Sequence, residues 1–374
     1  MHEHTRAWMR LIQTPGLGAK SALELLQHFG SATAICNASA RQLKGAGLGE
    51  KAIRALGEVD EARIEEGLQW LQQQRDHHLL TIDDSRYPEL LRQIPDPPAW
   101  LFLKGDLDLL SHPQLAIVGS RNPTRGGIDN ARRFAHHLAS QGLGISSGLA
   151  SGIDGAAHDG ALAADGITIA VVATGLDRVY PASNRELAHR IAEKGLLVSE
   201  FPPGTLPRAG HFPSRNRIIS GVSLGVLVVE AAEKSGSLIT ARLASEQSRE
   251  VFAIPGSIHN PMARGCHRLI RQGAKLVEKA EDILEELAPW LGQDEPPAGD
   301  AMQHPQPGDP QLDEDYKHLL GVLGYDPVSI DEIIHQSGLT AEEVSSMLLL
   351  LELQGHVESL SGNRFCRIES SSDH

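Results

Sequence analysis

The stretch LAIVGSRNPTRGGIDNARRFAHHLASQGLGISSGLASGIDGAAHDGALAADGITIAVVA, residues 115–173, decides the fold of this 374-residue chain. It contains three short apolar runs, Leu115–Val118, Gly144–Ser147 and Thr168–Ala173, and an amphipathic run, Asn130–Ser140, between the first two. Short apolar runs separated by helix-length amphipathic runs are typical of βαβ units, whose parallel strands are buried on both faces. The stretch therefore predicts a doubly wound, mostly parallel α/β sheet with helices on both faces.

The same rhythm continues towards the C-terminus. Leu196–Glu200, Gly225–Glu230 and Val251–Ile254 are further apolar runs, and Asn184–Glu193 and Leu238–Ser248 are further amphipathic ones. In open α/β sheets, ligands bind beyond the carboxyl ends of the strands. The loops that follow these runs are therefore where we expect the functional residues.

Charge is distributed unevenly along the chain, whose formal net charge is −14. Residues 1–111 hold 12 basic and 15 acidic residues, a net of −3, and residues 112–290 hold 19 and 17, a net of +2. Residues 291–374 hold 3 and 16, a net of −13. The near-neutral middle region can carry a local basic groove, so the global charge does not exclude a nucleic-acid partner.

Composition predicts a cytoplasmic globular protein of two or three domains. Hydrophobic residues make up 41% and charged residues 22% of a chain longer than one core usually supports. Charge, Gly or Pro interrupts the apolar stretches, and the N-terminus lacks a secretory pattern, so we expect neither a membrane span nor export. The three distant cysteines do not form a disulfide framework or a metal knuckle, and are expected to be buried thiols: Cys36, Cys266 and Cys366.

Two breaks in composition suggest the domain limits. Asp294–Pro310 is rich in Pro, Gly and Asp and is typical of a solvated linker, and Pro95–Pro98 disfavours helix ahead of the strand-rich region. The expected parts are a helical domain at 1–80, the sheet domain at 81–293, a linker at 294–311 and a C-terminal domain at 312–369.

The N-terminal part contains a weak repeat. Gly16-Leu17-Gly18 precedes the helical pattern Ser21–Phe29, and Gly47-Leu48-Gly49 precedes Lys51–Leu56. One interpretation is a pair of helix-hairpin-helix turns whose free amides contact DNA phosphates. The favoured alternative is a small helical bundle that uses these glycines only to turn, because the segment is net acidic.

The C-terminal part has the order of a winged helix-turn-helix. Helices are expected at Asp315–Leu323, Ile330–Gln336 and Ala341–Leu353, with Ser329 and Thr340 as N-caps. A hairpin of Val357–Ser359 and Phe365–Ile368 follows. The third helix carries glutamates and no Lys or Arg, whereas a major-groove reader presents donors. We therefore expect it to contact protein and not to read DNA.

Small, donor-rich loops follow four of the expected strands. Gly119-Ser120-Arg121 offers close backbone approach, a hydroxyl and a guanidinium, and 148–154 opens a helix of small residues typical of an anion site. Within the second loop, Asp154 and His158 lie four residues apart. One interpretation is a catalytic or metal-binding pair. We favour the alternative, an acid at the helix N-terminus and a histidine that packs inside the domain, because no third metal ligand is evident.

The other two loops carry more basic side chains. In HFPSRNRI, residues 211–218, the two arginines and the amide suit phosphate oxygens, and Phe212 suits a base. We expect one of these arginines to pair with Glu200 or Glu230 and the other to bind phosphate. The segment 234–237 adds a lysine beside a second helix-start anion cradle. Four such loops together indicate an extended polyanion and not one small ligand.

These motifs resemble those of the DprA/Smf (DNA-processing protein A) family. AIVGSR, SGLASGIDGAAHDGAL, GLDRVYPASN, SEFPPG, HFPSRNRIISG, VVEAAEKSGSLITA and REVFAIPGSI occur in the family's order over about residues 80–290. The resemblance implies a Rossmann-like core that binds single-stranded DNA, protects incoming strands during natural transformation, loads RecA recombinase and forms a homodimer. It also implies a SAM-like N-terminal domain and a winged-helix tail.

Carried over by motif, the DNA-binding residues are Ser120, Arg121, Gly148, Gly152, Asn184, Arg215, Asn216, Arg217, Lys234, Ser235, Gly236 and Ser237. The sequence departs from the family at Ala182, where some members have a lysine. Arg178, Arg185 or Arg208 nearby could take over the role of that lysine. No catalytic residue, metal ligand or cofactor is expected.

Two other classes of function compete with this one. A Rossmann-like nucleotide-processing enzyme acting on a phosphorylated small molecule would use the anion cradle with Asp154 and His158. The loops offer no activated nucleophile, metal cluster or paired carboxylates for such chemistry. A sequence-specific transcription factor is disfavoured by the acidic third helix of the tail.

Overall fold

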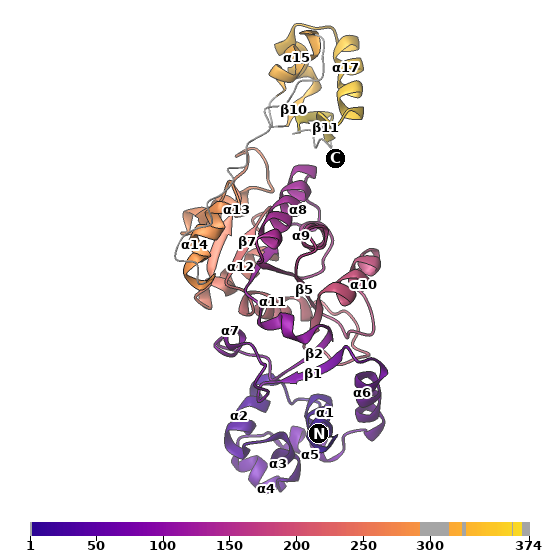
Figure 1. The fold of residues 1–374 in the computed structure, drawn as a ribbon, viewed down its shortest axis with the longest axis vertical. Helices are drawn as coiled ribbons and strands as arrows, with labels where there is room; N and C mark the ends of the chain where they lie inside the picture. The colour runs from indigo at the N-terminus through magenta and orange to yellow at the C-terminus, as the bar shows by residue number, and fades with distance from the viewer. Residues whose placement is uncertain (1, 292–313, 324–326, 361, 369–374) are drawn as a thin grey trace.

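The computed structural model describes residues 2–291, 314–323, 327–360 and 362–368. Figure 1 shows an N-terminal group of helices, a central sheet with helices on both sides, and a C-terminal winged-helix unit. The expected linker at 294–311 lies outside the described residues.

The N-terminal unit is a bundle of short helices. The Gly-Leu-Gly segments are its turns, as predicted: Gly16 (φ 84°) and Gly47 (φ 90°) adopt the left-handed conformation that favours glycine. Trp8, Ile35 and Ile64 are fully buried in its core. The helices are α1 (His2–Gln13), α2 (Ala19–Phe29), α3 (Ala32–Asn37), α4 (Ala40–Gly45), α5 (Glu50–Gly57) and α6 (Glu61–Gln73).

The central sheet confirms the predicted parallel arrangement and extends it. Its order is β1-β2-β6-β5-β4-β3-β7-β8-β9, in which β3 to β9 run parallel and β1 and β2 are antiparallel additions at one side. The strands are β1 (His77–Thr81), β2 (Trp100–Gly105), β3 (Gln114–Val118), β4 (Gly144–Ser147), β5 (Thr168–Val172), β6 (Leu196–Ser199), β7 (Gly225–Val228), β8 (Glu250–Ala253) and β9 (Lys275–Leu276).

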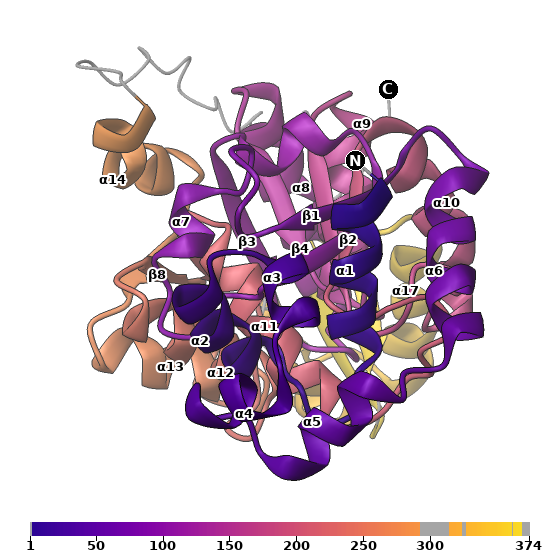
Figure 2. The same cartoon turned by 90° about the horizontal axis from the view of Figure 1, so that it is seen from below.

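Helices cover both faces of this sheet because its strands are apolar on both faces. One face packs against α8 (Arg125–Ser140), α9 (Ile153–Ala163), α10 (Arg185–Lys194) and α14 (Glu281–Leu291). The other packs against α11 (His211–Gly221), α12 (Ser237–Glu246) and α13 (Arg264–Arg271), which lie across the sheet from α10 in Figure 2. Three short helical segments occupy connections: α7 (Glu89–Arg92), η1 (Leu107–Ser111) and η2 (Ala182–Asn184).

The helical bundle and the sheet share a hydrophobic cluster. Trp8 of α1 packs edge-on against Trp100 of β2, with 6.3 Å between ring centroids, and Trp70 of α6 lies against Phe102 of the same strand. Strand β1 begins at His77, before the predicted domain limit at residue 80. The bundle therefore joins the sheet through the antiparallel strands, which the βαβ pattern does not predict.

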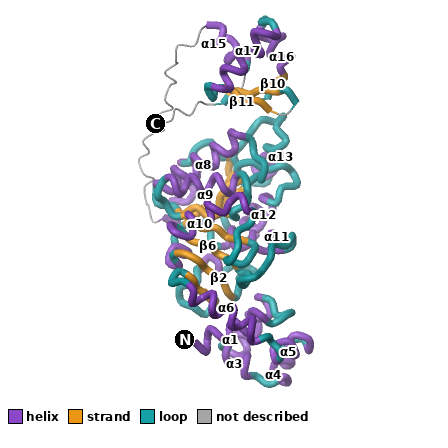
Figure 3. Tube along the Cα trace, turned by 90° about the vertical axis from the view of Figure 1, so that its right-hand side faces the viewer, coloured by secondary structure: helices purple, strands orange, loops and turns teal. Residues whose placement is uncertain are grey.

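The C-terminal unit has the predicted winged-helix order, seen beyond α8 in Figure 3. Ser329 and Thr340 cap their helices as expected, and Thr340 forms a capping box with Glu343. Ile333, Leu348 and Val357 are buried in its own small core. The elements are α15 (Glu314–Val322), β10 (Val328–Ser329), α16 (Ile330–Ser337), α17 (Ala341–Leu353), β11 (Val357–Leu360) and β12 (Arg364–Arg367).

The described residues contain no helix that is both long and apolar enough to cross a membrane. The three thiols are free. Cys266 and Cys366 are buried, as expected, whereas Cys36 is only partly buried. Burial raises the pKa of Cys266 to about 12, so this thiol is unreactive at neutral pH.

Candidate nucleic-acid interface

The loops singled out in the sequence meet at one edge of the sheet. Because β3 to β8 are parallel, their carboxyl ends lie together, and β3 pairs with β4 on one side and β7 on the other. From β3 the sheet is built on one side by β4, β5 and β6, and the chain then returns to the other side of β3 as β7. This position is the topological switch point, where ligands of such sheets bind. The loop after β3 therefore lies between the loops after β4 and β7.

Two glycines allow the first two loops to touch. A Cβ on Gly119 would lie 2.6 Å from the Ile153 side chain, and one on Gly152, at φ +81°, would lie 2.4 Å from the Ser120 carbonyl oxygen. The Ile153 amide donates to that carbonyl at 3.1 Å, and the buried Ser120 hydroxyl accepts from the Asn122 amide at 3.0 Å. Ser120 and Gly152 therefore shape the interface and leave Arg121 at its surface.

The loop after β4 differs from the expected anion cradle. The amides of Gly148 and Ala150 both donate to the Asp154 carboxylate at 3.2 Å, so a residue of the chain already occupies them. Asn184 donates from its side-chain amide to the Leu149 and Ala150 carbonyls at 3.0 and 3.1 Å. Burial raises the pKa of Asp154, against the opposing effects of Arg215 and of the two amides. Asp154 and Asn184 hold this loop in shape.

His158 and Asp154 form hydrogen bonds with different groups. Its Nδ1 lies 2.7 Å from the Thr168 hydroxyl, inside the sheet domain, and its side chain is fully buried. Burial lowers the pKa of His158 to about 3, so the ring is neutral. The residues that the structure describes contain no group of three or more His, Cys, Asp or Glu able to hold a metal ion. The interpretation as an N-terminal acid and a packing histidine agrees with this geometry.

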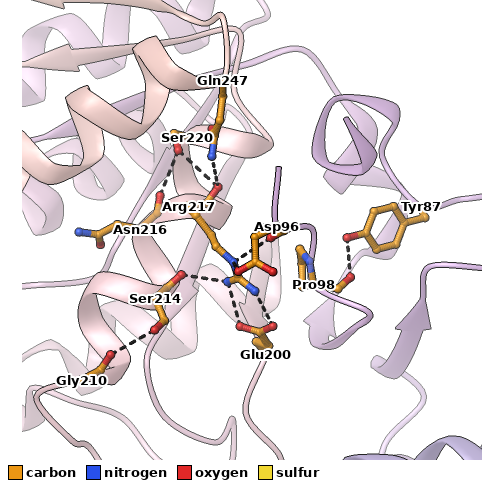
Figure 4. Close-up of polar contacts among 10 residues, drawn as sticks. All are labelled: Tyr87, Asp96, Pro98, Glu200, Gly210, Ser214, Asn216, Arg217, Ser220 and Gln247. Atoms are coloured by element: carbon orange, nitrogen blue, oxygen red, sulfur yellow. Dashed lines mark hydrogen bonds and ion pairs between the residues drawn. The ribbon is translucent and has the colours of Figure 1, made fainter. Parts of the chain in front are cut away.

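Arg217 is locked in an ion pair, shown in Figure 4. Its guanidinium donates to both Glu200 oxygens at 2.6 and 2.9 Å and, through Nε, to the Asp96 carbonyl at 2.9 Å. Burial lowers the pKa of Arg217, but the hydrogen bonds and charges of Glu200 and Asp96 outweigh it and raise the pKa overall. Two residues after Asp96, the Pro98 carbonyl accepts a hydrogen bond from the Tyr87 hydroxyl at 2.7 Å. Arg217 thus has the pairing expected for one of the two arginines.

The second arginine, Arg215, is not presented to solvent, which corrects the expectation that it binds phosphate directly. It is 4% exposed and donates through Nη1 to the Val171 carbonyl at 2.5 Å. A Cβ on Gly148 would lie 2.0 Å from that Nη1, so the loop after β4 rests on the guanidinium. Burial lowers the pKa of Arg215 to about 10, and it remains charged at neutral pH. Arg215 supports the interface from below.

At the surface of the interface, Arg121 lies beside two aromatic rings. The guanidinium carbon of exposed Arg121 lies 5.3 Å from the centroid of the Phe212 ring. The Tyr180 ring lies 5.8 Å from the same ring and is 47% exposed. Sequence reasoning missed Tyr180. It lies within the quoted motif GLDRVYPASN, but nothing in the spacing places it beside a residue of α11.

The loop after β7 adds polar groups at the start of α12. The Ser235 hydroxyl lies 2.7 Å from that of Ser237 and accepts from the Ser237 amide at 3.3 Å, while Lys234 and Gly236 are exposed. Glu230, two residues after the end of β7, accepts from the amide and hydroxyl of Thr124 at 2.9 and 2.6 Å. This joins the loops after β3 and β7.

The basic residues considered as replacements for the family's lysine differ in their surroundings. Ala182 is exposed, as are Arg185 and Arg208, whereas Arg178 forms an ion pair with Asp177 at 2.7 Å. Arg208 lies in the connection that leads into α11, shortly before Phe212. Arg185 and Arg208 are therefore better placed than Arg178 to meet an anion.

The chain is thus a protein with a doubly wound α/β domain between a helical bundle and a winged helix, with a cation and aromatic rings at the carboxyl edge of its sheet. The family model of DNA recombination-mediator protein A matches residues 78–288. The models of the SMF/DprA SAM domain and the DprA winged helix domain match residues 2–69 and 303–363. The chain belongs to the DprA/Smf family.

Bacterial relatives are similar over more than half of the chain. Protein Smf of Escherichia coli is 41% identical over 96% of this chain and 94% of its own length. DNA processing protein DprA of Bacillus subtilis is 52% identical over 56% of this chain and 70% of its own.

Two solved structures are similar to this chain in three dimensions. That of DNA processing protein A from Streptococcus pneumoniae has a TM-score of 0.69 and 39% identity, over 75% of this chain and 97% of that one. That of the Helicobacter pylori protein, described by its single-stranded DNA binding mode, has a TM-score of 0.52 and 31% identity, over 57% of this chain and 96% of that one.

Proposed function

We propose that this chain binds single-stranded DNA along the carboxyl edge of its sheet. The observation that carries the proposal is the grouping of exposed Arg121 and Tyr180 around the half-buried ring of Phe212. Proteins that bind single strands pair basic groups for phosphates with aromatic faces on which unpaired bases stack. The group offers both within one short span, and the single-stranded DNA binding mode described for the Helicobacter pylori protein supports this ligand.

The proposed site has a contacting layer and a supporting layer. Arg121, Asn216, Lys234, Ser235 and Gly236 contact the backbone, and the two aromatic rings contact bases. The supporting residues set the shape of the loops from beneath, through the hydrogen bonds and close approaches described above. They are Ser120, Gly148, Gly152, Asn184, Arg215, Arg217 and Ser237.

Duplex DNA fits this surface less well than a single strand. In a duplex the bases are stacked on each other and their faces are not available to Tyr180 and Phe212. Contacts to phosphate and stacking carry little sequence information, so binding has little base preference. Affinity falls steeply with salt, because each neutralised phosphate releases counterions.

The proposed cellular role follows family membership. The chain protects incoming strands during natural transformation in the cytoplasm, hands them to RecA recombinase and forms a homodimer through its sheet domain. It acts by binding and not by catalysis. The hydrogen bonds of Asp154 to its own loop and the buried, neutral ring of His158 support this proposal over the competing enzyme hypothesis.

The experiment is a titration of the full-length protein with labelled single-stranded and duplex oligonucleotides of one sequence, with nucleotide hydrolysis measured in parallel. The proposal predicts preference for the single strand, a steep salt dependence and no turnover. Equal affinity for duplex, or a flat salt response, would remove the single-strand assignment. Turnover that is lost with Asp154→Asn would establish the enzyme instead.

A further inference from the structure

The third helix of the winged-helix unit has two apolar faces, of which the fold uses one. Val344, Met347, Leu348 and Leu351 of α17 are buried in the core of the unit. On the opposite side of the helix, Leu349, Leu350 and Leu353 are 59%, 44% and 76% exposed. Leu353 follows the other two by four and three residues, so these side chains are neighbours on one face.

The position of these leucines is where winged helices usually present polar side chains to DNA. Three adjacent exposed leucines cost solvation and do not contribute to the core. We name Leu349, Leu350 and Leu353 the α17 leucine patch. Single exposed leucines are common in proteins, but a cluster on a helix face marks an interaction surface.

Acidic residues border the patch. Glu342 and Glu343 lie in the first turn of α17, and Glu352 lies next to Leu353. Residues 312–369 as a whole hold 3 basic and 11 acidic residues. This charge repels DNA phosphates and anionic lipid headgroups, and it also repels a second copy of the same acidic surface.

The chain's own linker is a poor occupant for the same reason. Residues 294–311 hold four acidic residues and no Lys or Arg, so their charge matches that of the patch border. The occupant with complementary chemistry has apolar side chains to bury against the leucines and cations to face the glutamates.

We propose that the α17 leucine patch docks a partner protein through an amphipathic helix whose apolar face is bordered by Lys or Arg. Helix faces of this kind pack side by side, with the leucines of one filling spaces between the apolar side chains of the other. Three leucines bury a small area, so the contact is transient. The winged helix is then a recruitment module.

The test uses the full-length protein and three labelled synthetic helical peptides of equal length. The first has a leucine face bordered by lysines, the second the same leucines bordered by glutamates, and the third the same lysines with serines in place of leucines. Fluorescence anisotropy is expected to show binding of the first peptide and at least tenfold weaker binding of the other two.

Two variants separate the apolar from the charged contribution. Leu349→Ser with Leu353→Ser weakens binding of the first peptide at least tenfold. The control Leu206→Ser, a matched change at an exposed leucine of the sheet domain, leaves the binding of this peptide unchanged. Glu342→Lys with Glu352→Lys reverses the preference towards the glutamate-bordered peptide. Because Leu349 and Leu353 are exposed, the serine variant retains the wild-type melting temperature.

Three outcomes overturn the proposal. The first is equal binding of the leucine and serine peptides, which would show that charge alone accounts for the contact. The second is concentration-dependent self-association in light scattering that Leu353→Ser abolishes, which makes a second copy the occupant. The third is duplex DNA binding that Leu349→Ser with Leu353→Ser removes, which makes α17 a DNA-binding element.

Discussion

The guanidinium of Arg217 faces the carboxylate of Glu200 with two hydrogen bonds, of 2.6 and 2.9 Å, and both side chains are nearly buried, at 11% and 13% exposure. The pair joins α11 to the end of β6. This contact turns a residue that the sequence places among the DNA contacts into one that holds the loops together.

Arg217→Ala is therefore expected to destabilise the protein. Removing one partner of a buried ion pair leaves the other charge uncompensated, at a cost of about 3 kcal/mol. Urea unfolding followed by circular dichroism measures this loss, and the double variant Arg217→Met with Glu200→Leu should recover part of it. Wild-type stability together with weak DNA binding would return Arg217 to the contacting layer.

Arg121→Ala is expected to weaken single-strand binding without affecting the fold. Arg121 is exposed, and a lost charge-assisted hydrogen bond costs roughly 1.5–3 kcal/mol. Anisotropy titrations give the affinity. The matched control is Lys194→Ala, at the opposite edge of the sheet, where the lysine pairs with Asp165 at 2.8 Å. Equal effects of the two changes would mean that Arg121 acts through general charge and not at a site.

His158 gives the protein a specific pH dependence. Its pKa is about 3 in the folded state, below the value of about 6.5 in an unfolded chain. Below pH 6.5 the unfolded chain binds a proton that the folded protein excludes, so stability falls by about 1.4 kcal/mol per pH unit until about pH 3. Between pH 6.5 and 5 the wild type should lose roughly 1.6 kcal/mol more than His158→Gln in urea unfolding. If the wild type and His158→Gln lost equal stability as the pH falls, the imidazole would be exposed to water in the folded protein.

Deleting residues 295–374 is expected to leave single-strand binding nearly intact. Residues 291–374 have a net charge of −13, so their removal lowers repulsion and can strengthen binding slightly at low salt. Titrating both forms with one oligonucleotide at two salt concentrations tests this. A loss of tenfold or more, about 1.4 kcal/mol, would make the winged helix a DNA-binding element.

The sequence predicts the parallel sheet and the loops at its carboxyl edge because the strands are short, apolar and separated by amphipathic helices. It does not predict which arginine faces where. Arg215 and Arg217 lie two residues apart on α11, so they point to different sides of the helix. Their partners, Gly148, Val171 and Glu200, come from three other segments. Such long-range contacts leave no local pattern in the sequence.

Strands β1 and β2 were missed for a related reason. They enter the sheet as an antiparallel pair outside the βαβ repeat, and β1 reads HHLLT, without an alternating apolar pattern. The winged-helix unit was predicted more fully, because Ser329 and Thr340 mark the starts of its helices through local capping chemistry.

Hydrogen–deuterium exchange of the full-length protein, with and without a single-stranded oligonucleotide, tests most directly whether DNA binds at the carboxyl edge of the sheet. We predict that DNA slows exchange in residues 119–124, 206–214 and 232–237, at that edge. We expect unchanged exchange in α17 and at the opposite edge, around residues 104–108 and 192–196. Protection confined to α17 or to that opposite edge, with the loops after β3 and β7 unaffected, would contradict the proposed interface.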